Sequence, residues 1–352
     1  MINRLLLFCF LSICCLCVNA QQGGTQLFSF LNQSPSSYAL SQGGIMISNA
    51  SQDISTALQN PATLNELTRN AISFNHTFHF SGINAGYFAY GNQFKKSKLD
   101  WHAAMQYTNY GEFQGADEWG NKGETFKAGD YALIFGVTKH LNEKFHVGVN
   151  SKVIYSRIEN YIATGIGFDI GGYYALKDKN ASIGVVAKNL GTVVKSYNST
   201  GGLLPFDLQV GFSKKLKYLP FRYNVTAHHL YKWDVRFDDP NLVINDSFLE
   251  DASEPNIYVQ GIDNVFRHLI FGGEFLLGKK ENLKVRFSYN HMLRQELAIR
   301  NLRSITGFSG GVELKVKQFF IGYSFGLQHQ HGSVKQLSIT TNFGRFKKKA
   351  KA

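Results

Sequence analysis

Cysteine is almost absent from this sequence, and its four cysteines, Cys9, Cys14, Cys15 and Cys17, all precede residue 18. The rest of the chain therefore offers no disulfide framework, no thiol nucleophile and no cysteine-based metal site. Proline is also scarce, with six residues, and no run of about 20 apolar residues follows the N-terminal segment. These absences exclude a disulfide-stapled small domain and predict no transmembrane helix. A chain of this length can instead be stabilised by one large closed fold.

The N-terminal segment has the features of a secretion signal. Arg4 precedes an apolar run from Leu5 to Val18, and Ala20 closes a small-residue stretch that suits cleavage. We expect residues 1–20 to be a cleavable signal peptide, with an uncleaved anchor as the alternative. The net charge of +12 comes from basic residues spread along the chain. For an exported protein this charge does not indicate nucleic acid, and no nucleic-acid partner is predicted.

Side chains alternate between apolar and polar or small over most of the chain. The pattern is explicit in "KFHVGVNSKVIY" (144–155), "LKVRFSYN" (283–290) and "FFIGYSFGLQ" (319–328). Successive strand residues point to opposite faces, so each of these segments has one apolar and one polar or small face. A soluble β-sandwich also alternates, but its strands are shorter and need no aromatic residue near their ends. The length and the aromatics favour a transmembrane β-barrel.

The alternating segments are fourteen in number, and an even number is what single-chain bacterial barrels require. Every second connection is short and contains lysine, whereas several of the others are long. We therefore predict an all-β fold, a 14-stranded antiparallel transmembrane β-barrel over residues 71–346, with a basic tail at 347–352. The expected strands are 71–80, 84–92, 99–109, 124–139, 145–156, 161–176, 181–189, 205–216, 221–231, 267–277, 283–294, 308–317, 319–327 and 337–346.

Residues 21–70 do not alternate. Asp53 suits the N-cap of a short helical turn in "DISTALQNPATL", and Pro61 stops or redirects the chain after Asn60. We expect this segment to be a hatch that plugs the barrel lumen, with Asp53 and Asn60 holding the corner through hydrogen bonds to the backbone. A tail outside the barrel is the alternative.

The stretch "ALSQGGIMISNASQDISTALQNPATL" (39–64) resembles the N-terminal hatch of FadL-type barrels. The matching positions are Gly43, Gly44, Asp53, Asn60, Pro61, Ala62 and Leu64. The resemblance implies a FadL-like barrel of fourteen strands with a hatch in the lumen. Within this family, "GGTQLFSFLNQSPSSYALSQGG" (23–44) is most similar to the PorQ-like barrels of the type IX secretion system. The PorV-like relatives of that system have a comparable hatch.

This resemblance also implies a function. PorQ-like barrels are non-enzymatic members of the type IX attachment complex in the cell outer membrane, where they hold a PorZ-like partner at the surface. The complex, with PorU-like and PorV-like proteins, processes secreted cargo and joins it to anionic lipopolysaccharide. The alternative is a FadL-like transporter of hydrophobic ligands or a PorV-like cargo shuttle.

The longest connection, 232–266, combines eight acidic residues with several aromatics. Acids make it a poor membrane contact, and exposed aromatics are typical of protein interfaces. We expect a partner-binding loop, with a merely solvated loop as the alternative. Its candidate contact residues are Trp233, Phe237, Asp238, Asp239, Phe248 and Tyr258.

Catalytic and cofactor chemistry is not indicated. The sequence contains no G-x-S-x-G nucleophile elbow, and "GIGFDIGG" (165–172) lies inside an expected strand. The histidine pairs at 228–229 and 329–331 have no carboxylate close by in the sequence, so neither a metal nor a cofactor is predicted. Polar residues expected to face the lumen argue against a hydrophobic conduit; they are His146, Lys152, Lys284, Arg286 and Asn290.

Overall fold

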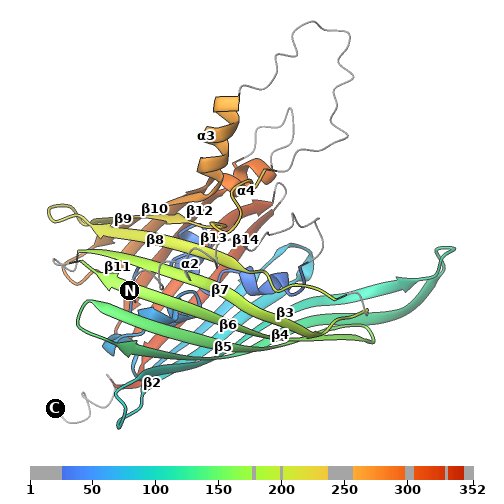
Figure 1. Ribbon diagram of the computed structural model, residues 1–352, viewed down its shortest axis with the longest axis horizontal. Coiled ribbons are helices and arrows are strands. Elements are labelled where there is room, and N and C mark those ends of the chain that lie inside the picture. The colour runs from blue at the N-terminus through green and yellow to red at the C-terminus, as the bar shows by residue number, and fades with distance from the viewer. Residues whose placement is uncertain are drawn as a thin grey trace, which may run out of the picture.

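Fourteen antiparallel strands close into one barrel (Figure 1). The computed structural model describes residues 26–176, 180–198, 201–236, 257–297, 305–329 and 332–344. Strand β1 pairs with β14, with Ala71 opposite Asn342, which closes the sheet. The strands are β1 (Ala71–Phe78), β2 (Asn84–Gln93), β3 (Asp100–Ala116), β4 (Lys122–His140), β5 (Phe145–Ile158), β6 (Tyr161–Ala175), β7 (Ala181–Lys195), β8 (Asp207–Lys215), β9 (Phe221–Ala227), β10 (Leu269–Leu277), β11 (Leu283–Asn290), β12 (Phe308–Val316), β13 (Phe319–His329) and β14 (Gly332–Asn342).

The barrel wall has an apolar outer face and a polar inner face. In β5, for example, Val149, Val153 and Tyr155 are exposed, whereas the alternate residues Asn150 and Lys152 are buried. Exposed large apolar side chains occur in the same way on most strands, and only lipid makes such a wall stable. The expected fold, a closed 14-stranded transmembrane barrel, is confirmed.

Short helices at the start of the described chain lie inside the barrel. Helix α2 contacts β12, β13 and β14, and the turn η3 contacts β4, β5 and β6 on the other side of the lumen. The elements of this hatch are η1 (Ser29–Asn32), α2 (Ser37–Ser41), η2 (Ile54–Leu58), η3 (Pro61–Thr63) and η4 (Glu66–Thr68). In the part of the chain that the structure describes, no helix is both long and apolar enough to span a membrane.

The two ends of the barrel differ. The connections β2–β3, β4–β5, β6–β7, β8–β9, β10–β11 and β12–β13 are short and lie at what we call the short-turn end. The opposite, long-loop end carries η5 (Phe80–Gly82), α3 (Ile257–Arg267) and α4 (His291–Glu296). Helix α3 rises above the rim of the barrel, with α4 beside its base (Figure 1).

Several predicted boundaries at the long-loop end are wrong. Residues 110–123 are mostly strand, because β3 and β4 continue into a hairpin in which Phe113 stacks on Phe126 at 5.4 Å. Strand β7 likewise runs to Lys195 rather than 189, and β14 spans 332–342 rather than 337–346. Strand β11 ends at Asn290 and not at 294, because the Asn290 side chain accepts a hydrogen bond from the Leu293 backbone and caps α4.

The connection expected at 232–266 is not all loop, because its last part forms α3. Strand β9 ends at Ala227 and not at 231, because the positive φ of His229 (56°) interrupts the extended backbone. The signal peptide, the basic tail and residues 237–256, which include Phe237, Asp238, Asp239 and Phe248, lie outside the described residues.

Candidate functional site

The Asn-Pro-Ala turn is the corner of the hatch. The Asn60 side chain accepts a hydrogen bond from the Ala62 backbone (3.0 Å) and donates to the carbonyl groups of Ile47 (2.8 Å) and Gly172 (3.2 Å). Thr138 on β4 donates to the Pro61 carbonyl. One side chain thus ties two hatch segments to the wall, and the turn is held from both sides.

Glycines in the wall make room for this corner. A β-carbon at Gly171 would lie 2.2 Å from the Asn60 amide oxygen, and one at Gly148 would lie 2.6 Å from the Pro61 backbone. Gly184 is equally close, because a β-carbon there would lie 2.1 Å from the Ile47 carbonyl oxygen. Three neighbouring strands therefore form a seat that only glycine permits. This explains Gly171 in the 165–172 segment, for which the sequence indicated close packing or curvature.

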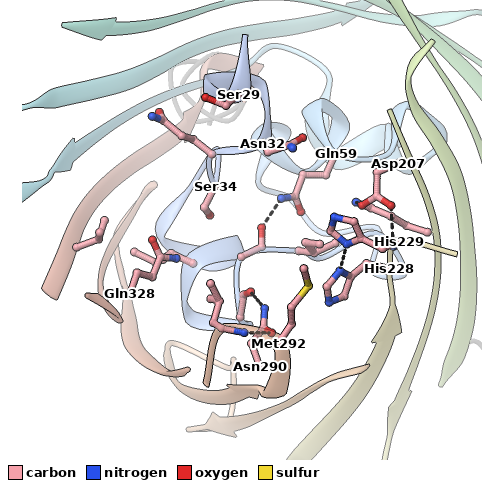
Figure 2. A pocket seen from close by; sticks show the side chains of 18 of the residues that line it. Ser29, Asn32, Ser34, Gln59, Asp207, His228, His229, Asn290, Met292 and Gln328 are labelled. Carbon is pink, nitrogen blue, oxygen red and sulfur yellow. Dashed lines mark hydrogen bonds between the residues drawn. The ribbon is translucent and has the colours of Figure 1, made fainter. Parts of the chain in front are cut away.

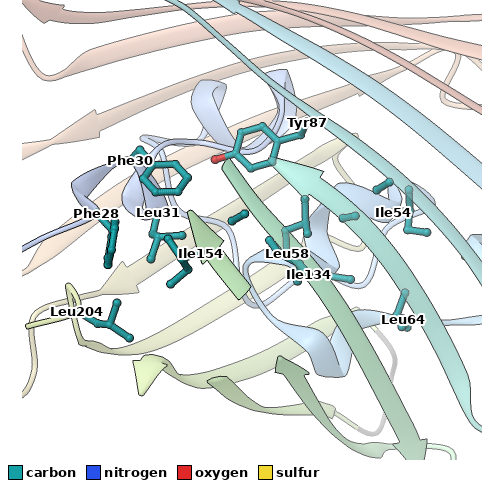
Figure 3. Close-up of a cluster of buried hydrophobic side chains, with 14 of the residues drawn as sticks. Phe28, Phe30, Leu31, Ile54, Leu58, Leu64, Tyr87, Ile134, Ile154 and Leu204 are labelled. Atoms are coloured by element: carbon teal, nitrogen blue, oxygen red, sulfur yellow. The ribbon is translucent and has the colours of Figure 1, made fainter. Parts of the chain in front are cut away.

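The other hatch positions that match the FadL-type pattern stabilise the local structure of the hatch or its packing against the wall. Asp53 caps η2 by accepting a hydrogen bond from the Ser55 backbone at 3.0 Å. Gly43 and Gly44 end α2 with positive φ values of 83° and 97°. Leu64 belongs to a buried apolar cluster, in which hatch residues such as Phe30 and Ile54 pack against the wall (Figure 3).

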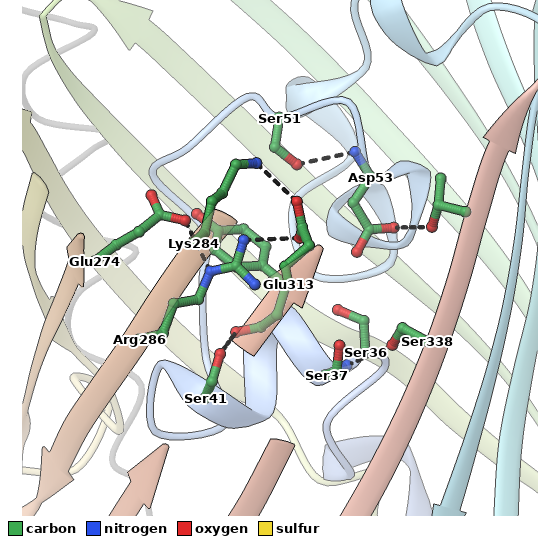
Figure 4. Close-up of polar contacts among 12 residues, drawn as sticks. Ser36, Ser37, Ser41, Ser51, Asp53, Glu274, Lys284, Arg286, Glu313 and Ser338 are labelled. Carbon is green, nitrogen blue, oxygen red and sulfur yellow. Dashed lines mark hydrogen bonds and ion pairs between the residues drawn. The ribbon is translucent and has the colours of Figure 1, made fainter. Parts of the chain in front are cut away.

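A buried ion-pair network joins the wall on the opposite side of the lumen. Arg286 lies between Glu274 and Glu313, at 2.8 Å from each carboxylate. Lys284 adds a bond to Glu313 at 2.8 Å (Figure 4). Arg222 adds a second bond to Glu274 at 2.7 Å. Charges this deeply buried are stable only when paired, so the network constrains β9 to β12 as one unit.

The same network holds the hatch. The guanidinium carbon of Arg286 lies 4.3 Å from the ring centroid of Tyr38 on α2, a cation–π contact. The space left between network and hatch is a cavity of only about 30 Å³, close to the volume of one water molecule. The hatch and the network therefore fill most of the space between them.

A larger cavity lies above the hatch, towards the long-loop end. It measures about 420 Å³, and its walls are both apolar and polar, including Leu40 and Gln209. Met292 and His229 illustrate the two kinds of side chain in Figure 2. Hatch residues form its floor, since the Gln59 side chain donates to the Gly44 carbonyl at 2.7 Å. A volume of this size suits a small ligand.

A polar junction fixes α3 and α4 to each other. The Asp263 carboxylate on α3 accepts hydrogen bonds from Arg267 (2.7 Å) and from His291 on α4 (2.9 Å). Burial by itself would raise the pKa of Asp263, but these two hydrogen bonds outweigh it and hold the pKa below the ordinary value. Asp263 therefore stays ionised at neutral pH, and the junction persists.

The predicted site residues are placed as follows. Lys152, Arg286 and Asn290 are buried on the lumen side of the wall, and His146 and Lys284 are partly buried there. Trp233 is 71% exposed at the long-loop end, where its carbonyl accepts from Asn264 and His268. Tyr258 lies on α3 rather than in a loop.

Sequence reasoning missed the lumen carboxylates. Asp169 pairs with Lys152 at 2.7 Å, and Glu274 and Glu313 pair with the predicted cations of β11. Each sits at an inward position of an alternating strand, which is the signal that identified the lysines. The alternation within one strand does not show which inward residue of the next strand lies opposite, so these acid–base pairs could not be read from it.

Comparisons with known proteins reveal similarity in structure alone. No family model and no curated protein matches the chain. It is similar to the Pseudomonas putida toluene transporter TodX, with a TM-score of 0.52 and 12% identity over 88% of this chain and 98% of TodX. The CymD monoaromatic hydrocarbon channel gives a TM-score of 0.51 and 13% identity over 90% of this chain and 99% of CymD. At such identities the likeness shows the fold, and it agrees with the expected FadL-like barrel.

Proposed function

We propose that the protein is a non-enzymatic outer-membrane barrel that anchors a protein partner at the cell surface. The partner we propose is a PorZ-like member of the type IX attachment complex, by the resemblance of residues 23–64. The observation that carries the proposal is a lumen occupied by the hatch, beneath a platform formed by α3 and α4 at the long-loop end. Short turns would then face the periplasm and α3 the outside.

The occupied lumen supports anchoring over bulk passage. Arg286 and its carboxylates join the wall to α2, while the Asn60 corner seats in the glycines of the opposite wall. Opening a wide channel would require both attachments to break. A barrel of this design suits a rigid support better than a solute channel.

The platform offers apolar surface to a partner. On α3, Ile262 is 60% exposed, and Val265 and Phe266 are exposed as well. Trp233 stacks on His268 at 5.7 Å and presents its other ring face near the base of α3. Apolar and aromatic side chains on a rigid element are the usual energetic centre of a protein interface.

Charging this platform should release the partner. We expect the double substitution Ile262→Glu, Val265→Glu to weaken docking by about 2 kcal/mol or more, roughly 30-fold in Kd, because both side chains would be desolvated at the interface. The measurement is the fraction of the PorZ-like protein shed into the medium by cells that express the variant. Leu219→Glu is the matched control, since Leu219 is 59% exposed but lies in the β8–β9 turn at the opposite end.

Heat-modifiable gel migration, typical of closed barrels, would verify that both variants fold. Normal retention of the partner on a folded Ile262→Glu, Val265→Glu variant would rule out docking through α3. Equal shedding from the Leu219→Glu control would show that the effect is not specific to the platform.

A second candidate function is passage of a small hydrophobic ligand, which the 420 Å³ cavity favours. The proteins of similar fold named above are a toluene transporter and a monoaromatic hydrocarbon channel. Under this alternative the purified barrel binds toluene saturably, and Leu293→Arg in the cavity wall abolishes binding. Partner retention would then be unaffected by charges on α3.

A further inference from the structure

Three side chains of types that can bind metals lie together at the wall of the 420 Å³ cavity above the hatch. Asp207 begins β8, and His228 and His229 directly follow β9. These two strands are antiparallel neighbours, so the start of one and the end of the other lie together at the long-loop end. One ligand atom from each residue lies within 4.8 Å of the others. Figure 2 shows the two rings and the carboxylate side by side.

The two histidines are adjacent in sequence and yet face each other. In an extended chain their rings would point to opposite sides, but His229 has a φ of 56° and turns its ring towards His228. Their Nδ1 atoms are 2.5 Å apart. At most one hydrogen fits between these nitrogens, so at least one of them presents a lone pair at this point.

One nitrogen of the His228 ring makes no hydrogen bond to the described residues. The His228 side chain is buried, at 3% exposure, and the nitrogen without a partner is its Nε2 atom. A buried polar atom without a partner is costly, so the Nε2 atom is available to a ligand that enters the cavity. The ring lines the 420 Å³ cavity, so a small ion has room to approach.

The carboxylate is oriented by a second layer of bonds. Asp207 accepts a hydrogen bond from the Gln209 amide on one oxygen and from the His229 backbone on the other, each at 2.7 Å. His268 bonds to the His228 carbonyl at 2.7 Å and fixes the backbone of the pair. Such outer bonds orient the ligands of metal sites in proteins.

We propose that Asp207, His228 and His229 bind a divalent transition metal of the zinc class. Two imidazoles and one carboxylate are a ligand set for Zn²⁺, whereas Mg²⁺ and Ca²⁺ take oxygen ligands. Tetrahedral Zn²⁺ ligands stand about 2.0–2.2 Å from the ion and therefore roughly 3.3–3.6 Å from one another, so the Nδ1 atoms of His228 and His229 would have to move apart to bind one ion together. All three side chains line the cavity, so a water molecule there would have access to a fourth position on the ion.

Nearby basic side chains oppose a cation, because Lys232 acts electrostatically on His229 and Lys188 acts on Asp207. Lys188 is the register partner of Asp207 and lines the same cavity, so its ammonium competes for the carboxylate. Glu296 on α4 also lines the cavity and contributes negative charge. Bound metal would clamp the start of β8 to the segment that leads to Trp233 and the base of α3.

The test is metal binding by the full chain, purified in detergent without a histidine tag. We expect saturable binding of one Zn²⁺ per chain in calorimetry and a Co²⁺ visible spectrum typical of a four-coordinate site. Asp207→Asn and His228→Ala should each weaken Zn²⁺ binding by more than about tenfold, and Gln209→Leu by roughly 10- to 100-fold. Lys188→Met should bind Zn²⁺ more tightly, since it removes the competing charge.

His76→Ala is the matched control, because His76 lies on β1 and bonds to Tyr107. It should bind Zn²⁺ as the unmodified chain does, and heat-modifiable migration verifies that each variant folds. Absence of saturable Zn²⁺ binding by the unmodified chain would overturn the proposal. Equal binding by folded Asp207→Asn and His228→Ala variants would overturn it as well, because any metal would then be held elsewhere.

Discussion

Replacing Gly171 by valine should unseat the hatch and open the barrel. A β-carbon at this position would lie 2.2 Å from the Asn60 amide oxygen and 2.9 Å from the Pro61 ring, and valine adds two further carbons. Overpacking of this kind costs about 1–3 kcal/mol, and here it falls on the residue that ties the corner to the wall. We expect a clear rise in single-channel conductance in planar bilayers, against a low conductance for the unmodified chain.

The neighbouring glycine supplies the control. A β-carbon at Gly172 meets no atom within 4 Å, so Gly172→Val should leave conductance unchanged while altering the strand in the same way. Large and stable conductance from the unmodified chain would show that the hatch does not seal the lumen. Unchanged conductance of a folded Gly171→Val barrel would mean that the corner is not the closure.

Removing the central cation of the lumen network should be the most destabilising single change. Arg286→Met leaves Glu274 with Arg222 alone and Glu313 with Lys284 alone, and it takes the cation away from Tyr38. Breaking a buried ion pair by deleting one partner costs about 3–5 kcal/mol, because the remaining charges stay buried without full compensation. The measurement is the free energy of unfolding in urea with detergent, followed by heat-modifiable migration.

Charge removal on the partners separates electrostatics from packing. The triple variant Arg286→Met, Glu274→Gln, Glu313→Gln should recover most of the lost free energy of unfolding, since no unpaired carboxylate remains. Lys284→Met should cost less than Arg286→Met, because Glu313 keeps its bond to Arg286. If the triple variant is no more stable than Arg286→Met, the loss comes from packing and the network has no electrostatic role.

The barrel could be predicted from local sequence patterns. The period of two in β5, β11 and β13 assigns each residue to the outer or inner face, because strand geometry leaves no other choice. The number of strands followed from the same period together with the turns. The Asn-Pro-Ala corner was also predictable, since proline and the asparagine before it restrict the backbone locally.

Which side chains meet in the lumen could not be predicted from these patterns. Arg286, Glu274 and Glu313 come from three strands, and their contact depends on the register between those strands. Asp207 lies 22 positions from His229 along the chain, so the apparent lack of a carboxylate beside the histidine pair was a matter of sequence distance. The periodicity of one strand reports which way a side chain points and carries no information about its height relative to the next strand. That height is set by the closing of the barrel, which brings these charges together.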